Sequence, residues 1–226
     1  MSIRINTKTA RAYNSNAPHE RRNAVKHGID VSYAQGSIDF KKLKGKTDFV
    51  IIRAGYGRLA SQKDIRFERN YKGCKAAGIP CGAYWFSYAD STTDARREAR
   101  AFLKVIKGKK FEYPVWYDVE GQALSGGKAF VSSKCKAFCE EMEKAGYFVG
   151  IYSSSYPLQT FFTKEVRTRY AVWAAQYGET LDYPGPVGMW QNSSTGRKSG
   201  ITGNVDTDIC YEDYPEIIRH AHLNGY

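Results

Sequence analysis

The chain lacks any long hydrophobic run. Its 226 residues contain no stretch of about 18 consecutive apolar residues, so we expect no transmembrane helix. Residues 1–27 also lack the apolar segment of a secretory signal. They form a polar stretch with six Lys and Arg against one acid, Glu20, and we expect a basic, loosely ordered arm.

Metal-binding and disulfide patterns are missing as well. The five cysteines match no disulfide framework, and the four histidines lie near the chain ends, away from any cysteine pair. We interpret the cysteines as small buried thiols, at Cys74, Cys81, Cys135, Cys139 and Cys210. The glycine pattern of a dinucleotide-binding loop is absent too. We therefore expect neither a metal ion nor a cofactor.

Positive charge is in excess, with a formal net charge of +11 and a pI near 9.3. Such a surface attracts polyanions, which include nucleic acids, anionic lipids and acidic wall polymers. The chain has no dense Lys/Arg run and no aromatic RNA-binding signature. Charge alone does not choose among these partners.

Strand and helix patterns alternate through the first two thirds of the chain. Apolar, β-rich runs predict five strands, at 28–33, 48–57, 81–89, 114–120 and 147–155. Helical patterns predict helices between and after them, at 38–43, 67–77, 91–106, 130–145 and 156–162. This order is typical of an α/β protein with a parallel sheet.

The last third has little room for helices. Three further strands are expected in "YAVWAAQY", "VGMWQ" and "GNVDTDIC", joined by short connections rich in Gly, Pro, Ser and Asn. Eight strands with helices after the first five predict an irregular TIM-like barrel, five β/α units followed by three helix-poor strands. We assign residues 28–226 to this one barrel domain.

Two acids stand one residue apart in "PVWYDVEG", at Asp118 and Glu120. Side chains alternate along a strand, so both point to the same face, with Cα atoms roughly 6.5 Å apart. The carboxyl ends of the strands form the usual active site of a β/α barrel. The pair therefore predicts a catalytic site there.

Two more acids have similar places, Asp30 in "GIDVS" and Asp206 in "NVDTD". The first and last strands of a closed barrel are neighbours, so we expect all four acids at one mouth. Their mutual repulsion would raise carboxyl pKa values, and a protonated acid facing an ionised one suits glycosidic bond cleavage. Oxygen ligands for a divalent cation are the alternative. For Asp208, a structural and a functional role remain equally open.

The motifs together resemble the glycoside hydrolase family 25 lysozymes, N-acetylmuramidases of the Chalaropsis type. "GIDVSYAQGSIDF", "FVIIRAGYG", "KAAGIPCGAYWFSYA", "PVWYDVEG" and "VDTD" occur in that family's order. The likeness extends from about Gly28 to the C-terminus. Two departures are Asp208, where many relatives have Asn, and the absence of appended wall-binding repeats.

The resemblance implies an enzyme that hydrolyses the β-1,4 bond between N-acetylmuramic acid and N-acetylglucosamine in peptidoglycan. Its acidic positions fall on Asp30, Asp118, Glu120 and Asp206, with Glu120 as general acid. Asp118 would assist attack by the substrate's acetamido group, and a covalent nucleophile is the rival mechanism. Two alternatives remain: an enzyme that hydrolyses another acetamido sugar, as chitinases do, and a wall-binding module without activity.

Aromatic and amide side chains near the strand ends are expected to bind the sugar. They are Tyr56, Tyr84, Phe86, Trp116, Tyr152, Trp173 and Gln191. The expected partners are peptidoglycan strands and anionic wall polymers, not nucleic acid or membrane, and we expect a monomer. We expect action outside the cell or at the wall, in the manner of a phage-type lysin.

Overall fold

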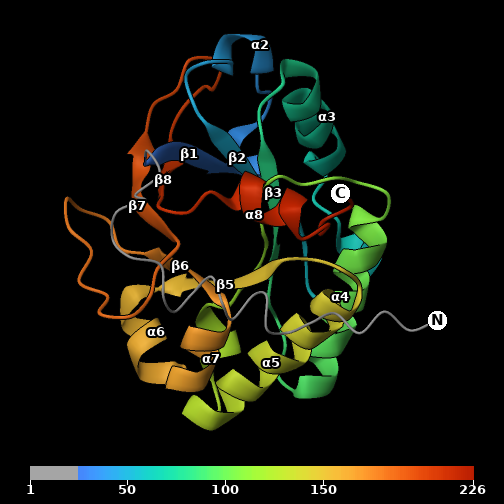
Figure 1. Cartoon of the computed structure of the whole chain (residues 1–226), viewed down its shortest axis with the longest axis vertical. Helices are drawn as coiled ribbons and strands as arrows, with labels where there is room; N and C mark the ends of the chain where they lie inside the picture. The colour runs from blue at the N-terminus through green and yellow to red at the C-terminus, as the bar shows by residue number, and fades with distance from the viewer. Residues whose placement is uncertain (1–24) are drawn as a thin grey trace.

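A closed eight-stranded barrel forms the centre of the protein, and the computed structural model describes residues 25–226 (Figure 1). The strands follow one another around the barrel in chain order. They are β1 (Lys26–Val31), β2 (Phe49–Tyr56), β3 (Cys81–Phe86), β4 (Val115–Asp118), β5 (Val149–Ser154), β6 (Ala171–Ala175), β7 (Met189–Gly196) and β8 (Val205–Cys210). The predicted α/β barrel is confirmed, including the pairing of its first and last strands.

The barrel begins slightly earlier than the predicted boundary at Gly28. Lys26 and His27 belong to β1, where they pair with Cys210 and Ile209 of β8. The rest of the predicted arm, residues 1–24, lies outside the described residues.

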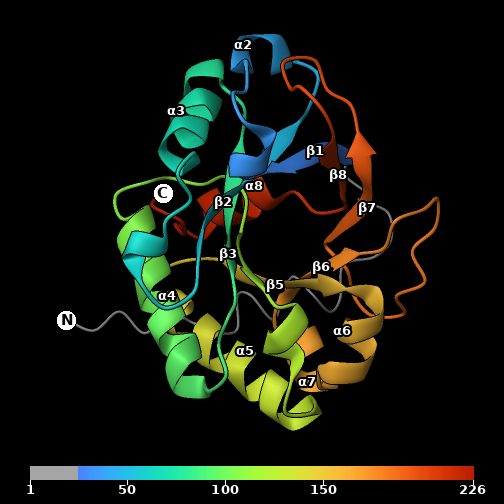
Figure 2. The same cartoon turned by 180° about the vertical axis from the view of Figure 1, so that it is seen from behind.

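Helices cover the outside of the barrel between the first six strands (Figures 1 and 2). They are α2 (Phe40–Leu43), α3 (Phe67–Ala77), α4 (Thr92–Ile106), α5 (Lys128–Lys144), α6 (Ser155–Phe161) and α7 (Lys164–Arg169), with α8 (Tyr214–His220) after the barrel. Ser91 caps α4 by accepting from the Asp94 amide, and Gly78 ends α3 in the left-handed conformation. Between residues 171 and 210 the described chain has no helix, as predicted, whereas α7 and α8 were not predicted.

The last strand runs against its neighbours. Strands β1 to β7 are parallel in succession, while β8 pairs antiparallel with both β7 and β1. The beginning of β8 therefore lies at the same end of the barrel as the carboxyl ends of the other strands. We call this end the mouth.

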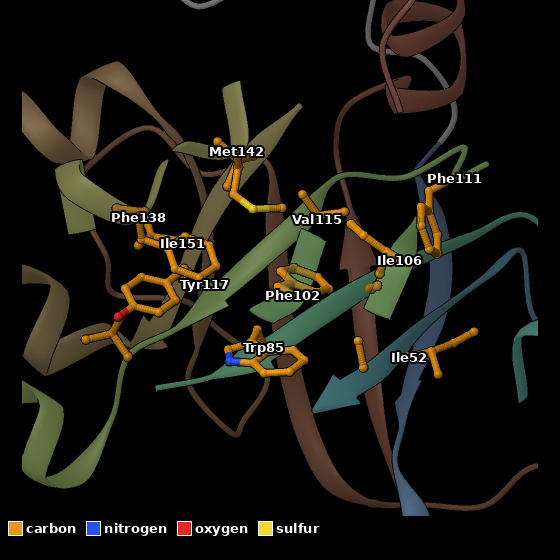
Figure 3. Close-up of a cluster of buried hydrophobic side chains, with 14 of the residues drawn as sticks. Ile52, Trp85, Phe102, Ile106, Phe111, Val115, Tyr117, Phe138, Met142 and Ile151 are labelled. Carbon is orange, nitrogen blue, oxygen red and sulfur yellow. The ribbon is translucent and has the colours of Figure 1, made fainter. Parts of the chain in front are cut away.

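Alternation along the strands produces two apolar layers. The outer layer packs between barrel and helices, where Tyr117 of β4 stacks on Phe138 of α5 and Trp85 of β3 stacks on Phe102 of α4 (Figure 3). All four rings are almost completely buried, and each stabilises the fold by about 1.5–3 kcal/mol. The inner layer fills the lower part of the barrel.

The end of the barrel opposite the mouth is closed by α8 and the residues after it. Tyr214 of α8 is buried against Tyr113 and Trp116. Asn224 accepts from the Phe148 amide at 2.7 Å and donates to the Tyr113 carbonyl at 2.9 Å. Because this end is plugged, a ligand can reach the interior only at the mouth.

All five cysteines are free and buried, which confirms their interpretation as buried thiols. Within residues 25–226, no helix is both long enough and apolar enough to span a bilayer.

Candidate active site

The four predicted acids gather at the mouth. Asp30 of β1 and Asp206 of β8 are direct Cα partners, which only the antiparallel direction of β8 allows. Asp118 ends β4, in register with Phe86 of β3 and Tyr152 of β5. The backbone is still extended at Glu120 (φ −138°, ψ 173°), so Asp118 and Glu120 keep to one side of the chain.

The acids lie at two depths. Asp30 and Asp118 are only 4% and 5% exposed, whereas Glu120 and Asp206 are half-buried. Two carboxyls thus form the floor of the site and two its rim. A rim acid can reach a bond of an entering polymer, while a floor acid is restricted to groups that project inward.

A hydrogen-bond chain fixes Asp30. The Gln191 amide donates to Asp30 Oδ2 at 2.7 Å, and Tyr152 Oη donates to Gln191 Oε1 at 2.9 Å. Tyr152 therefore orients the amide so that its N–H points at the carboxyl. Gln191 is 3% exposed and already bonded to protein, so its predicted contact with sugar is replaced by support of Asp30.

Burial and mutual repulsion raise the pKa values of the clustered acids. Burial raises the pKa of Asp118 well above its usual range, and the charges of Glu120 and Asp30 raise it further against the opposing charge of Arg53. The pKa of Glu120 is raised by burial and by the charge of Asp206, although the Ser154 side chain opposes the shift. Burial and the charge of Asp206 also raise the pKa of Asp30. The cluster therefore retains protons toward neutral pH, as an acid catalyst requires.

These shifts predict that the fold is more stable in mild acid than at neutral pH. A raised carboxyl pKa means that the folded state binds more protons than the unfolded state, so stability falls as pH rises above the unfolded value of about 4. We expect a higher melting temperature at about pH 5.5 than at about pH 7.5, at constant ionic strength, and a smaller difference for Asp118→Asn. A melting temperature that rises over this interval in the wild type would contradict the assignment.

Two carboxyl oxygens at the base of the site have no partner among the described residues, Asp118 Oδ1 and the deeper Asp208 Oδ2. Among the described residues, nothing hydrogen-bonds to the buried Asp118 Oδ1. A buried polar atom without a partner costs about 1–3 kcal/mol, so Asp118 Oδ1 is an acceptor that the described residues leave unused.

Asp208 lies one step deeper, in register with Gly28 and Gln191. The Trp173 indole donates to Asp208 Oδ1 at 2.9 Å, and Asp208 is only 1% exposed. Burial and the charges of Asp30 and Asp206 raise its pKa. Its geometry favours the structural role of orienting Trp173.

The predicted aromatic residues divide into an interior group and a rim group. Tyr84 and Tyr152 pack on Trp173, with ring centroids 6.2 and 4.5 Å away. Trp116 lies beneath, between Trp173 and Tyr214, with no exposed surface. The prediction that Trp116 binds sugar is wrong, because the interior-facing side chain of β4 one step below Asp118 is already inside the plugged core.

The rim group was only partly predicted. Tyr56 and Phe86 both contact Tyr88, which follows β3 and is 43% exposed but was not singled out from the sequence. Tyr177, 59% exposed, was also missed, and its hydroxyl lies 3.4 Å from Gln191 Oε1. Both follow strand ends, which is the signal that would have identified them.

Arg53 is a further residue that sequence reasoning missed. It is the charged residue in the apolar strand β2, and its Nε donates to Asp64 Oδ2 at 2.7 Å. Its charge lowers the pKa of Asp118, so it partly offsets the repulsion among the acids. A charge within an otherwise apolar strand could have flagged it.

An open groove of about 500 Å³ adjoins the site at Ser154, whose side chain opposes the raised pKa of Glu120. Its other lining residues include Tyr156, Gln159, Gln176, Tyr177 and Asp182. Hydroxyls, amides and rings of this kind suit a carbohydrate. Within residues 25–226, no three His, Cys, Asp or Glu side chains are grouped as metal ligands.

Comparison with known proteins gives consistent matches. The sequence profile of "Glycosyl hydrolases family 25" matches residues 29–201. The "Autolytic lysozyme" of Clostridium acetobutylicum is 28% identical over 190 residues, covering 80% of this chain and 54% of that protein. "Lysozyme M1" of Streptomyces globisporus is 26% identical over 206 residues, covering 79% and 65%.

Among solved structures, the modular autolysin LytC of Streptococcus pneumoniae, in complex with a synthetic peptidoglycan ligand, superposes with a TM-score of 0.75 at 30% identity. The match covers 83% of this chain and 47% of that one. A family 25 glycosyl hydrolase of Bacillus anthracis shares the fold, with a TM-score of 0.73 at 21% identity, covering 92% and 100%. The chain thus spans about half the length of the autolytic lysozyme and of LytC.

Proposed function

The chain belongs to family 25 of the glycosyl hydrolases, and we propose that it is a lysozyme that cleaves bacterial peptidoglycan. The bond is the β-1,4 linkage from N-acetylmuramic acid to N-acetylglucosamine. The acid cluster at the mouth carries this proposal, because its carboxyls have raised pKa values and share protons, and a protonated carboxyl beside an ionised one is the equipment for glycosidic cleavage. Relatives named as lysozymes and autolysins support it.

Glu120 acts as the general acid. It is half-buried at the rim, adjoins the groove through Ser154, and has a raised pKa. Asp118 lies deeper on the same side of the strand, where its free Oδ1 accepts a hydrogen bond from the substrate's acetamide N–H. Asp30 and Asp206 contribute the negative field that keeps Glu120 protonated.

The other expected residues have supporting roles. Tyr56, Phe86, Tyr88 and Tyr177 line the rim, where their rings can pack on sugar faces. Tyr84, Tyr152 and Trp173 shape the floor. The enzyme acts on the wall from outside the target cell, as the autolysin and endolysin names of related structures suggest.

End-group analysis tests the bond assignment. Purified peptidoglycan is digested, reduced and hydrolysed, and the new sugar alcohols are identified. Muramitol is expected, since cleavage leaves muramic acid at the reducing end. Glucosaminitol would mean that the enzyme is a glucosaminidase. If neither sugar alcohol is formed by a correctly folded protein, the chain is a binding module without activity.

Salt should weaken association with walls. Exposed charges are screened over about 8–10 Å at physiological ionic strength, so a positively charged protein loses long-range attraction as salt is added. We expect the fraction of Glu120→Gln protein that sediments with walls to fall between about 0.02 M and 0.2 M salt. Equal binding across this range would show that groove contacts dominate.

A further inference from the structure

Two basic segments far apart in the chain come together on one side of the barrel. The first includes Lys41, Lys42, Lys44 and Lys46, in and after α2; the second is Arg197 and Lys198, in the β7–β8 connection. The connection reaches over to α2 in both views (Figures 1 and 2). We call these six residues the basic surface.

Two hydrogen bonds fix this arrangement. Lys198 Nζ donates to the Lys46 carbonyl at 3.1 Å, and the Asp39 amide donates to the Gly200 carbonyl at 2.9 Å. The Lys42 Cβ lies 3.3 Å from where a Cβ on Gly200 would be. Strand β8 begins just after this connection, at Val205, and Asp206 is its second residue. The basic surface therefore adjoins the β1–β8 side of the mouth.

Charge is poorly balanced here. Among the described residues, the single ion pair within the basic surface joins Lys42 to Asp39 at 4.0 Å. On the α4–α5 face, by contrast, Glu141 pairs with Arg96, Arg100 and Lys144. Several cations of α4 and α5 thus have carboxylate partners, whereas the cations of the basic surface other than Lys42 have no ion pair among the described residues and are left for an external anion.

We propose that the basic surface binds a phosphodiester polymer of the bacterial wall, and this rests on the proposed lysozyme function. Five of its six cations are exposed. Five of the six are lysines, which bind phosphate as mobile point charges rather than as fixed forks. Phe40, the aromatic residue of α2, is buried, so it offers no ring for stacking nucleic-acid bases.

The test compares two variants of equal net charge. One replaces Lys41, Lys44, Lys46, Arg197 and Lys198 with Gln. The control replaces five cations elsewhere with Gln, namely Lys104, Lys107, Lys128, Lys136 and Lys164. Binding of poly(glycerol phosphate) and of a DNA duplex of matched charge is measured at about 0.15 M salt.

We expect the first variant to lose at least about tenfold in affinity for poly(glycerol phosphate), since each cation contributes roughly a factor of five near an anionic surface. The control should lose less than threefold. Equal losses in both variants, or tighter wild-type binding to DNA than to the wall polymer, would overturn the proposal. Hydrolysis of walls stripped of the polymer reports on the lysozyme function separately.

A second, independent observation concerns a buried lysine. Lys134 of α5 is 1% exposed, and its Nζ donates to the carbonyls of Ala123, at 2.7 Å, and Ala89, at 3.1 Å. The Phe130 ring lies 5.0 Å from Nζ. Among the described residues, no carboxylate oxygen lies within 4.0 Å of Lys134 Nζ. Burial lowers the pKa of Lys134. Such burial is costly unless the ammonium has a structural or functional task.

Lys134 is connected to Glu120 through Ala123. Ala123 belongs to the 3-10 turn η3 (Gly121–Leu124) for which Glu120 is the N-cap residue, and the Ala123 amide donates to the Glu120 carbonyl at 3.0 Å. Ala89 follows Tyr88, whose own amide is held by buried Glu98 at 2.7 Å. One ammonium thus joins the loop after β4 to the loop after β3.

We infer that Lys134 is a positioning residue that holds Glu120 at the mouth, which rests on the assigned role of Glu120. Lys134→Met should lower kcat at least tenfold while KM changes less than threefold, because the groove is left intact. Amides 121–124 should exchange hydrogen faster. Lys136→Met, two residues along the same helix and exposed, is the matched control.

A kcat of Lys134→Met within twofold of the wild type, in a variant with native circular dichroism, would overturn this inference. If Lys134→Met does not fold, Lys134→Gln decides: its amide retains donors, so a three- to tenfold loss in kcat is expected, and a loss below twofold overturns the role. Glu120→Gln is assayed alongside. Retained activity there would refute the role of Glu120 itself.

Discussion

Glu120→Gln is expected to abolish measurable lysis while the protein remains folded. A general acid contributes about 10²–10⁴-fold, and glutamine cannot donate the proton that the leaving oxygen needs. Glutamine is nearly isosteric with glutamate. The substitution also removes an ionisable carboxyl at a position where burial and the charge of Asp206 raise the carboxyl pKa. The melting temperature at neutral pH should therefore equal or exceed that of the wild type.

Release of reducing ends from purified peptidoglycan and a circular dichroism melt together check this outcome. Glu179→Gln, an exposed residue in the β6–β7 connection, makes the same chemical change outside the site and should retain full activity. Retention of more than about a tenth of the activity by Glu120→Gln would exclude Glu120 as the acid.

The second large effect concerns the acetamido group of the substrate. If its carbonyl oxygen attacks the anomeric carbon, Asp118 must accept the amide N–H and stabilise the positive charge that develops. The buried Asp118 Oδ1, without a partner among the described residues, is suited to that bond. A substrate that carries a 2-hydroxyl in place of the acetamide should then be cleaved at least about a hundredfold more slowly.

Asp118→Asn separates the two mechanisms further. It removes the charge that stabilises the reacting acetamide, so kcat should fall by a similar factor, with little change in KM. Comparable rates on the acetamido and hydroxyl substrates would refute substrate assistance. So would a glycosyl ester on any of the acids, detected by mass spectrometry, since it would show a covalent nucleophile.

Local patterns were sufficient for much of the fold. Helix α3 occupies the predicted residues 67–77, because its end is encoded by Gly78. Helices α7 and α8 were missed, since both are short and their stability comes from packing. Asp118 and Glu120 could be placed together, because side-chain alternation is a property of one strand.

The sequence by itself determined the α/β alternation, the helix-poor last third, and the placement of Asp118 and Glu120 on one side of a strand. These follow from short-range rules of periodicity and capping. Only the tertiary structure decided that β8 runs antiparallel, which brings Asp206 opposite Asp30. It also decided that Trp116 is enclosed beneath Trp173, that Gln191 supports Asp30, and that Lys198 meets Lys46. Each of these depends on contacts between residues far apart in the chain, which packing of the whole barrel selects and no local pattern encodes.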